Sequence, residues 1–196
     1  MTPAEIRSLA ILPRSFYARP AAEVARLLLG KMLVHGGRAG RIVETEAYLG
    51  ETDRAAHTFH GRTARTEVLY GEPGHAYVYL IYGMHECLNV VAEPAGSPGC
   101  VLIRALEPVA GIGAMTVERP RTHSTAELCS GPGNLTRAMG ISRRHYGADL
   151  THGALTIRQM DVPREEVLTG PRVGIRHSTD WELRFHIRGN PSVSSK

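Results

Sequence analysis

Several stretches of the chain alternate between apolar and polar residues, a period of two that is typical of half-buried β-strands. These stretches are rich in Val, Ile, Leu and Tyr and end near glycine or other turn-forming residues. Gly36 and Gly37 join the first two stretches, which predicts a β-hairpin. The predicted strands cover residues 31–35, 41–48, 76–82, 87–91, 101–106, 154–158 and 183–188.

Helical patterns are fewer and shorter than the strand patterns. Residues 21–29 are dominated by Ala, Leu and Arg and stop at Gly30, which predicts one helix. Other patterns predict helices over 108–117 and 134–139, a helical turn at 66–69, and loops over most of 49–75 and 118–125. Because no repeat or linker interrupts the chain, we predict a single α+β domain over residues 1–196 with a mixed or antiparallel sheet.

The strand predicted at residues 41–48 carries two carboxylates. Alternation places Ile42, Glu44, Glu46 and Tyr48 on one face, with the two glutamates about 7 Å apart at roughly 3.3 Å per residue. Paired carboxylates can cleave a glycosidic bond, although the pattern does not say which is the acid, the base or the nucleophile. The alternative interpretation is that both are solvated charges on an edge strand. The ring of Tyr48 argues against it, because such a ring can stack on a planar ligand.

Three further features are compatible with nucleic-acid chemistry. Five of the seven tyrosines fall within residues 48–82, a clustering that suits base stacking but also a pleated core. Residues 131–135, Gly-Pro-Gly-Asn-Leu, can direct backbone N–H groups at a phosphate, although a plain turn before a helix is the commoner explanation. His57 and His60 have H-x-x-H spacing, but glycine-rich surroundings do not predict a helix there, so we predict no metal site.

Composition narrows the class of protein. The chain has 196 residues and a formal net charge of +4, and 21 of its 23 basic residues are Arg. Arginine suits phosphate recognition, although a GC-rich genome produces the same bias. Cys87, Cys100 and Cys129 form no C-x-x-C pair, and their odd number argues against a disulfide framework. Since no apolar run has the length of a membrane span and no signal peptide is recognisable, we expect a cytoplasmic protein without a membrane partner.

Short segments spread from about residue 27 to residue 192 match one protein family in the same order. The segments are Arg41–Gly50, Ala55–His57, Tyr77–Met84 with Asn89, Val101–Pro108, Glu127–Pro132, Arg172–Gly174 and Arg184–Gly189. Together they resemble the alkyladenine (3-methyladenine) DNA glycosylases. His85 and Glu86 stand where mammalian members have aromatic residues, and the loop at 118–126 is shorter, so the bacterial branch is closer. A glutamate at position 86 leaves the local DNA contacts open, since phosphate repels it.

The resemblance implies a fold and an activity. The expected fold is a compact domain with a curved, mainly antiparallel sheet flanked by helices and a basic, DNA-facing groove. The expected activity is DNA repair: the enzyme flips an alkylated purine out of double-stranded DNA and hydrolyses its N-glycosidic bond, leaving an abasic site. By family match Tyr82 is the wedge that fills the gap from the minor groove, and Met84 and His85 are DNA-binding residues beside it.

The resemblance also implies the catalytic groups. Glu46 corresponds to the carboxylate that deprotonates the attacking water, and Arg104, with the backbone carbonyl of Val173, corresponds to the groups that hold this water. Glu44 shares the predicted face with Glu46, so like-charge repulsion is expected to raise the pKa of Glu46, although a coupled pair cannot be assigned from sequence. Nothing in the resemblance implies a metal or a cofactor.

Base recognition and substrate follow from the same match. Tyr48, His57 and Tyr79 correspond to residues that enclose the flipped purine, and Asn89 to a position that obstructs the 2-amino group of guanine. We expect 3-methyladenine to be the principal substrate because a cationic base leaves without further protonation. Activity on 7-methylguanine, hypoxanthine or ethenoadenine stays open, and the neutral bases need a general acid that the sequence does not identify.

Lysine content bears on the outcome of the reaction. The chain has only Lys31 and Lys196, and neither lies in a matching segment near Glu46. A glycosylase that also nicks DNA needs an amine for a Schiff base, so we predict a monofunctional enzyme. A monomer is the default expectation, and a bacterial DNA repair enzyme is expected to act at the nucleoid.

Two other function classes stay open at this point. The first is a nucleosidase or sugar glycosidase that uses Glu44 and Glu46 on a small substrate, and the second is a non-catalytic protein that only binds damaged DNA. Duplex binding with a steep salt dependence would argue against the first, and loss of function on replacing Glu46 would argue against the second.

Overall fold

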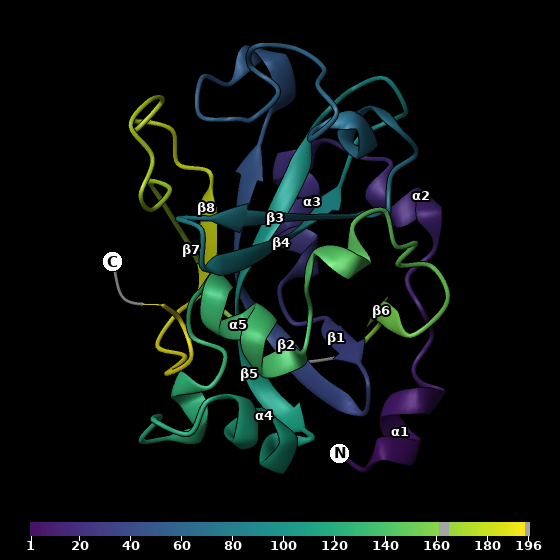
Figure 1. The fold of residues 1–196 in the computed structure, drawn as a ribbon, viewed down its shortest axis with the longest axis vertical. Helices are drawn as coiled ribbons and strands as arrows, with labels where there is room; N and C mark the ends of the chain where they lie inside the picture. Colours follow the sequence, from purple (N-terminus) through teal and green to yellow (C-terminus); the bar gives the residue numbers. More distant parts are fainter. Residues whose placement is uncertain (161–164, 195–196) are drawn as a thin grey trace.

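One antiparallel sheet organises the protein. The computed structural model describes residues 1–160 and 165–194, and within them eight strands pair in a single sheet. The strands are β1 (Met32–His35), β2 (Arg38–Tyr48), β3 (Ala76–Ile81), β4 (His85–Val91), β5 (Cys100–Ala110), β6 (Leu155–Arg158), β7 (Val167–Gly170) and β8 (Arg184–Ile187). Their order is β3-β4-β5-β2-β1-β6, and β8 pairs with both β2 and β7. In Figure 1, β3 and β4 run across the long strands β2 and β5. The predicted α+β class, as a single compact domain with a curved, mainly antiparallel sheet, is confirmed.

Short helices cover the sheet. They are α1 (Pro3–Ser8), α2 (Arg14–Tyr17), α3 (Ala21–Leu28), α4 (Ile112–Glu118) and α5 (Pro132–Met139), with 3-10 turns at Gly50–Thr52, Glu67–Tyr70, Thr125–Glu127 and Arg143–His145. Helix α3 packs on β2 and β5, and α5 packs on β4 and β5. Leu28 and Leu135 from these two helices belong to the same apolar core as Ile103 of β5. The main core therefore lies between the sheet and its helices.

The predicted turn chemistry agrees with the first hairpin. His35 of β1 pairs with Arg38 of β2, and the two glycines between them have φ of +55° and +79°. Two successive left-handed residues fit the twist of a two-residue β-hairpin, and glycine adopts this conformation without steric cost. This hairpin begins the long strand β2.

The helix predicted over 108–117 is wrong at its beginning. Residues 108–110 continue β5, because β2 extends back to Arg38 and its Ala39 pairs with Ala110. Pro108 lies opposite Gly40, beside a register shift, a place where a strand tolerates a residue without an N–H donor. Helix α4 begins only after Gly111. The sheet thus takes up the backbone that a local pattern assigned to a helix.

The sequence patterns miss α1, α2 and β7, each of six residues or fewer. A signal for α1 was present, since Thr2 and Glu5 form a reciprocal capping box at its start. Most other predicted elements shift by only one to three residues. The strand predicted over 76–82 is one residue too long, because β3 ends at Ile81. Tyr82, the predicted wedge, lies in the turn that follows.

A bulge in β2 changes which residues share a face. The pairing of β2 with β5 shifts register around Glu44, and Ile42 packs in the main core together with Ala47. Ile42 therefore does not face the same side as the two glutamates, and the alternation-based prediction is wrong for this residue. The prediction holds for Glu46 and Tyr48, whose side chains are hydrogen-bonded to each other.

Candidate active site

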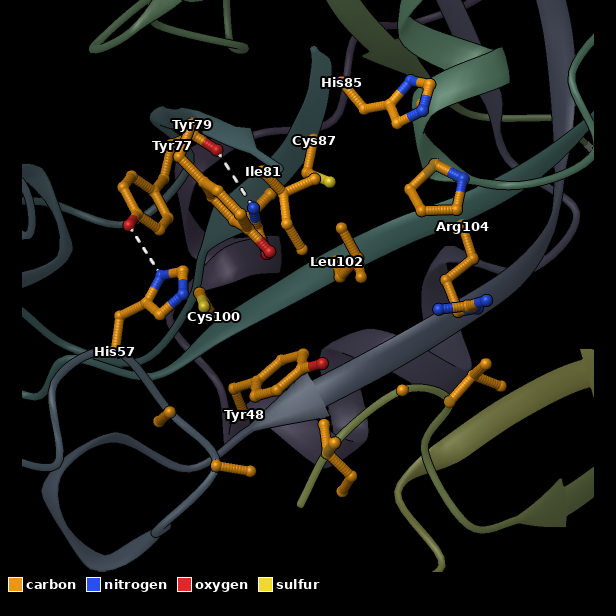
Figure 2. A pocket seen from close by; sticks show the side chains of 18 of the residues that line it. Tyr48, His57, Tyr77, Tyr79, Ile81, His85, Cys87, Cys100, Leu102 and Arg104 are labelled. Carbon is orange, nitrogen blue, oxygen red and sulfur yellow. Dashed lines mark hydrogen bonds between the residues drawn. The ribbon is translucent and has the colours of Figure 1, made fainter. Parts of the chain in front are cut away.

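A cavity of about 540 Å³ gathers most of the predicted site residues. Its walls come from β2, β3, β4 and β5, the loop at residues 54–58, the start of α5 and residues 173–177. The predicted residues that line it are Tyr48, His57, Tyr79, Tyr82, His85, Asn89, Arg104 and Val173. Figure 2 shows Tyr48 on one side and Tyr77, Tyr79 and His57 on the other, with Cys100 and Leu102 between them. Met84 lines a neighbouring cavity instead.

Glu46 lies directly behind the wall of this cavity. Its side chain is fully buried, and three lining residues contact it. The Tyr48 hydroxyl donates to Oε2 at 2.9 Å, the backbone N–H of Val173 donates to Oε1 at 2.7 Å, and Arg104 lies 3.2 Å from Oε1. Val173 thus contacts Glu46 through its N–H, and the predicted role of its carbonyl stays a prediction. A water that reached this carboxylate would sit among fixed donors.

Burial sets the electrostatics of Glu46. Burial raises its pKa above the ordinary value, and the opposing effects of Arg104, the Val173 N–H and the Tyr48 hydroxyl do not cancel it. The charge of Glu44 also raises the pKa, as the sequence predicted, but it is a smaller cause than burial. A carboxylate with a raised pKa is a stronger base once it is ionised.

Glu44 has a different environment although it is only two residues away. Its Oε1 accepts from Nε of Arg104 at 2.9 Å and from Nε of Arg184 at 2.7 Å, and Ser194 donates its N–H to Oε2 at 2.8 Å. Burial alone would raise the pKa of Glu44, but Arg104, Ser194 and Arg184 outweigh it, so the pKa is lowered. Both glutamates are fully buried, which contradicts the interpretation as solvated edge charges. Neither Arg184 nor Ser194 was predicted as a partner of Glu44.

Tyrosine and histidine rings form one wall of the cavity. Nδ1 of His57 lies 2.8 Å from the Tyr77 hydroxyl, and its ring centroid lies 4.6 Å from that of Tyr79 in an edge-to-face arrangement. Although part of the His57 surface is exposed, burial against this wall and then the nearby charge of Arg65 lower its pKa to about 4. His57 is therefore neutral at physiological pH and has one donor and one acceptor nitrogen.

Asn89 lies in the strand next to this wall. It is 2% exposed, and its side-chain amide donates to the backbone carbonyl of Tyr77 at 3.2 Å. Because β4 pairs with both β3 and β5 at this residue, its position is fixed on two sides. The recognition roles predicted for Asn89, Tyr48, His57 and Tyr79 stay predictions, but all four line one cavity.

A buried ion pair that the sequence analysis did not single out supports the site. The Arg172 guanidinium binds both oxygens of Asp53, donates to the backbone carbonyl of Ala47 at 3.0 Å and lies 4.6 Å from the Tyr48 ring centroid. Val173 is the next residue, so this pair holds both the N–H and the hydroxyl that contact Glu46. Arg172 therefore supports two groups that contact Glu46, and its signal in the sequence was its place beside Val173 in a matching segment.

The turn between β3 and β4 presents apolar side chains to solvent. Tyr82 and Gly83 have φ of +53° and +70°, and the Met84 N–H donates to the Ile81 carbonyl. Tyr82 is 82% exposed and Met84 71%. A bulky residue with positive φ is uncommon and costs on the order of 1 kcal/mol or more. Exposed large apolar side chains on a strained turn mark a contact surface.

The remaining predicted features have other environments. His60 packs against Phe59, and among residues 1–160 and 165–194 no group of three His, Cys, Asp or Glu side chains is arranged to hold a metal. Lys31 precedes β1 and lines neither cavity, whereas Lys196 lies outside the described residues. Within the described part, no helix has both the length and the apolar character needed to cross a membrane.

Comparison with known proteins shows the family to which this sequence belongs. The family described as Methylpurine-DNA glycosylase (MPG) matches residues 15–191. A protein of Methanocella arvoryzae is 48% identical over 95% of this chain and 96% of its own length, and one of Burkholderia lata is 47% identical over 94% and 91%. One of Anaeromyxobacter dehalogenans is 50% identical over 93% and 86%. Each is named "Putative 3-methyladenine DNA glycosylase". The chain belongs to the methylpurine-DNA glycosylase family.

Proposed function

We propose that this DNA repair glycosylase flips an alkylated purine, 3-methyladenine above all, into the 540 Å³ cavity and hydrolyses its N-glycosidic bond with a water activated by Glu46. The observation that carries the proposal is the fully buried Glu46 behind a cavity whose other wall is tyrosine and histidine. Such a site places a base between aromatic side chains and its sugar against a carboxylate.

The residues around Glu46 support a general-base step. Ionised Glu46 takes a proton from water, the water oxygen bonds to the anomeric carbon, and the bond from that carbon to the purine nitrogen breaks with its electron pair on the base. Arg104, 3.2 Å from Oε1, compensates the buried negative charge. The Tyr48 hydroxyl and the Val173 N–H fix the carboxylate. General-base catalysis by a positioned group contributes about 10²–10⁴-fold to a rate.

Substrate preference follows from the charge of the base. A 3-methyladenine base is cationic in the nucleotide and leaves as a neutral molecule, so it needs no general acid. Nδ1 of neutral His57 contacts the Tyr77 hydroxyl, so Nε2 is the ring nitrogen that can hydrogen-bond to an adenine-like base. In this proposal, buried Asn89 excludes a 2-amino group. Hypoxanthine, ethenoadenine and 7-methylguanine are secondary candidates, and the neutral bases require protonation on departure.

Release of free base from methylated duplex DNA tests this proposal. The intact protein is incubated with the DNA in EDTA, and the freed bases are separated by chromatography beside a Glu46→Gln control. We expect 3-methyladenine from the wild type and a release rate at least about 10²-fold lower from Glu46→Gln, which retains lesion binding. Equal release by both proteins would overturn the role of Glu46. Binding without release by the wild type would favour a lesion sensor, and release from free nucleosides would favour a nucleosidase.

The same reaction tests monofunctional hydrolysis. A borohydride trap captures a Schiff base between protein and DNA, and we expect no trapped product. If trapping occurs, Lys196→Ala and Lys31→Ala identify whether a lysine forms it. A trapped wild-type complex would contradict a water-only mechanism.

Tyr82→Ala tests base flipping separately. Because a wedge is needed only where a stack must be filled, we expect base release from duplex DNA to fall about tenfold or more, and release from single strands by less than about threefold. Met84, on the same turn, is the matched exposed control, and Met84→Ala should have the smaller effect on duplex. Equal losses on both substrates for Tyr82→Ala would contradict the wedge role.

A further inference from the structure

A second cavity, of about 860 Å³, lies beside the first. The two share His85, Gly133 and Asn134 as lining residues, so these three form the wall between them. A Cβ at position 133 would lie 3.0 Å from the His85 side chain, which shows how closely α5 approaches β4 here. The exposed turn after β3 borders both cavities, since Tyr82 lines the first and Met84 the second. The second cavity therefore continues the candidate active site past the tip of the turn.

Arginines dominate the charge of the second cavity. Arg119, Arg121 and Arg137 line it, and Arg121 and Arg137 are exposed and have no ion-pair partner among the described residues. Arg119 is used by the fold, because its Nη1 donates to the carbonyls of Glu127 and Leu128. Burial and the neighbouring charge of Arg137 lower the pKa of Arg119. The repulsion between Arg119 and Arg137 would be relieved by an anion bound between them.

The carboxylate in the lining does not cancel this charge. Glu86 is mostly buried, and its Oε1 faces Nε of Arg143 at 3.5 Å, while its Oε2 has no hydrogen-bond partner. Its backbone carbonyl accepts from the Thr136 hydroxyl at 2.8 Å, which ties β4 to α5. Glu86 is therefore part of the cavity wall, and the basic side chain that faces its carboxylate is Arg143.

We propose that the second cavity binds a backbone phosphate of the DNA next to the flipped nucleotide, with Arg121 and Arg137 as its phosphate ligands. The proposal rests on the proposed function, because Tyr82 must enter the duplex for the DNA backbone to cross the turn that carries Tyr82 and Met84. A strand that places one nucleotide in the first cavity passes the shared wall of His85 and Gly133 and meets the unpaired arginines. Phosphate contacts of this kind fix the register of a protein on DNA without reading sequence.

Salt-dependent binding to duplex DNA tests the assignment. The full chain is compared with Arg121→Ala/Arg137→Ala and with Arg7→Ala, a matched control on α1 whose side chain is exposed and lines neither cavity. Each phosphate contact contributes about 0.9 to the slope of log K against log [salt], so we expect the double variant to lose about 2 from the slope. Its affinity at 100 mM salt should fall tenfold or more, and that of Arg7→Ala by less than about twofold.

Three additional arms make the result decisive. Thermal unfolding of all three proteins reports whether the exposed substitutions leave the fold intact. A single-stranded oligonucleotide with the lesion tells whether the phosphate belongs to the damaged strand or to the opposite strand. If it belongs to the damaged strand, the double variant loses affinity for the single strand as it does for the duplex. Base release by the wild type tests the glycosylase proposal on its own, so a changed slope without release would retain the phosphate site and reject that function. If the double variant and Arg7→Ala have the same slope and affinity, the phosphate site is wrong.

Discussion

Glu44 and Glu46 are two residues apart on one strand, are equally buried, and share Arg104, yet their environments differ in one decisive respect. Glu44 has a second arginine, Arg184, and both a backbone and a hydroxyl donor from Ser194. Glu46 has one arginine and two neutral donors, each of which belongs to the cavity wall. The pKa of Glu44 is consequently lowered and that of Glu46 is raised.

On the proposed function, the difference separates a structural carboxylate from a reactive one. A buried carboxylate with two arginines holds four segments together: β2, β5, β8 and the chain near residue 194. A buried carboxylate with too little compensation is kept ionised at a cost in free energy, which a proton or a reacting water can relieve. Two identical side chains on one strand can thus have different roles because the partners come from distant parts of the chain.

Stability measurements at pH 7 should give the largest separation between the two residues. Glu44→Gln leaves Arg104 and Arg184 without their shared partner, so we expect the free energy of unfolding to fall by about 3–5 kcal/mol. Glu46→Gln removes a charge that burial disfavours and keeps an acceptor for the Val173 N–H, so its change should stay within about 1 kcal/mol. Urea unfolding of both variants and the wild type measures this.

The sign of the pH dependence sharpens the same test. The lowered pKa of Glu44 stabilises the fold above about pH 4.5, its ordinary value, and this contribution is lost as pH falls through the lowered value. The raised pKa of Glu46 has the opposite effect on stability. Ionised Glu46 destabilises the fold above the raised pKa, and this destabilisation disappears when acidification protonates the carboxylate. Wild type and Glu44→Gln should therefore converge in stability at acid pH. Equal losses for the two variants at pH 7 would mean that both glutamates are structural.

The pH dependence of catalysis should show the next largest effect. If Glu46 is the base, the rate of 3-methyladenine release at saturating enzyme falls about tenfold per pH unit below its pKa, and the midpoint lies above the ordinary 4.5. No second, alkaline limb from a general acid is expected, because this base is cationic in the nucleotide and leaves as a neutral molecule without further protonation. Circular dichroism at each pH separates the effect from unfolding. A rate that stays flat down to pH 4.5 would assign the reaction to another group.

Local patterns predicted those parts of the fold that local physics determines. The glycine pair at 36–37, the helix before Gly30 and the face shared by Glu46 and Tyr48 are confirmed because turn conformation, capping and alternation are properties of neighbouring residues. The continuation of β5 through Pro108 is not such a property, since it depends on pairing with residues about 70 positions earlier. The bulge that turns Ile42 into the core likewise arises from pairing between β2 and β5.

The residues of the site also differ in whether the sequence could predict them. Family resemblance pointed to eight of the lining residues, most of which lie in the matching segments. It gave no role beside Glu44 to Arg184 or Ser194, which lie 140 and 150 residues from Glu44. The buried Asp53–Arg172 pair spans 119 residues in the same way. Compensation of a buried charge is a property of the packed molecule, and a one-dimensional pattern carries little trace of it.

Replacing the Tyr48 hydroxyl should give the smallest effect. It tests the difference between the two carboxylates through one hydrogen bond, which only Glu46 accepts. Tyr48→Phe removes one donor from Glu46 and none from Glu44, while it keeps the ring beside Arg172. Because that donor lowers the pKa of Glu46, the acid limb of base release should move to higher pH, with lesion affinity changed by less than about threefold. Tyr48→Leu, which also removes the ring, should lose about tenfold in affinity, as expected for a stacking contact. An unmoved limb in Tyr48→Phe would show that the hydroxyl does not contact Glu46 in the reacting complex.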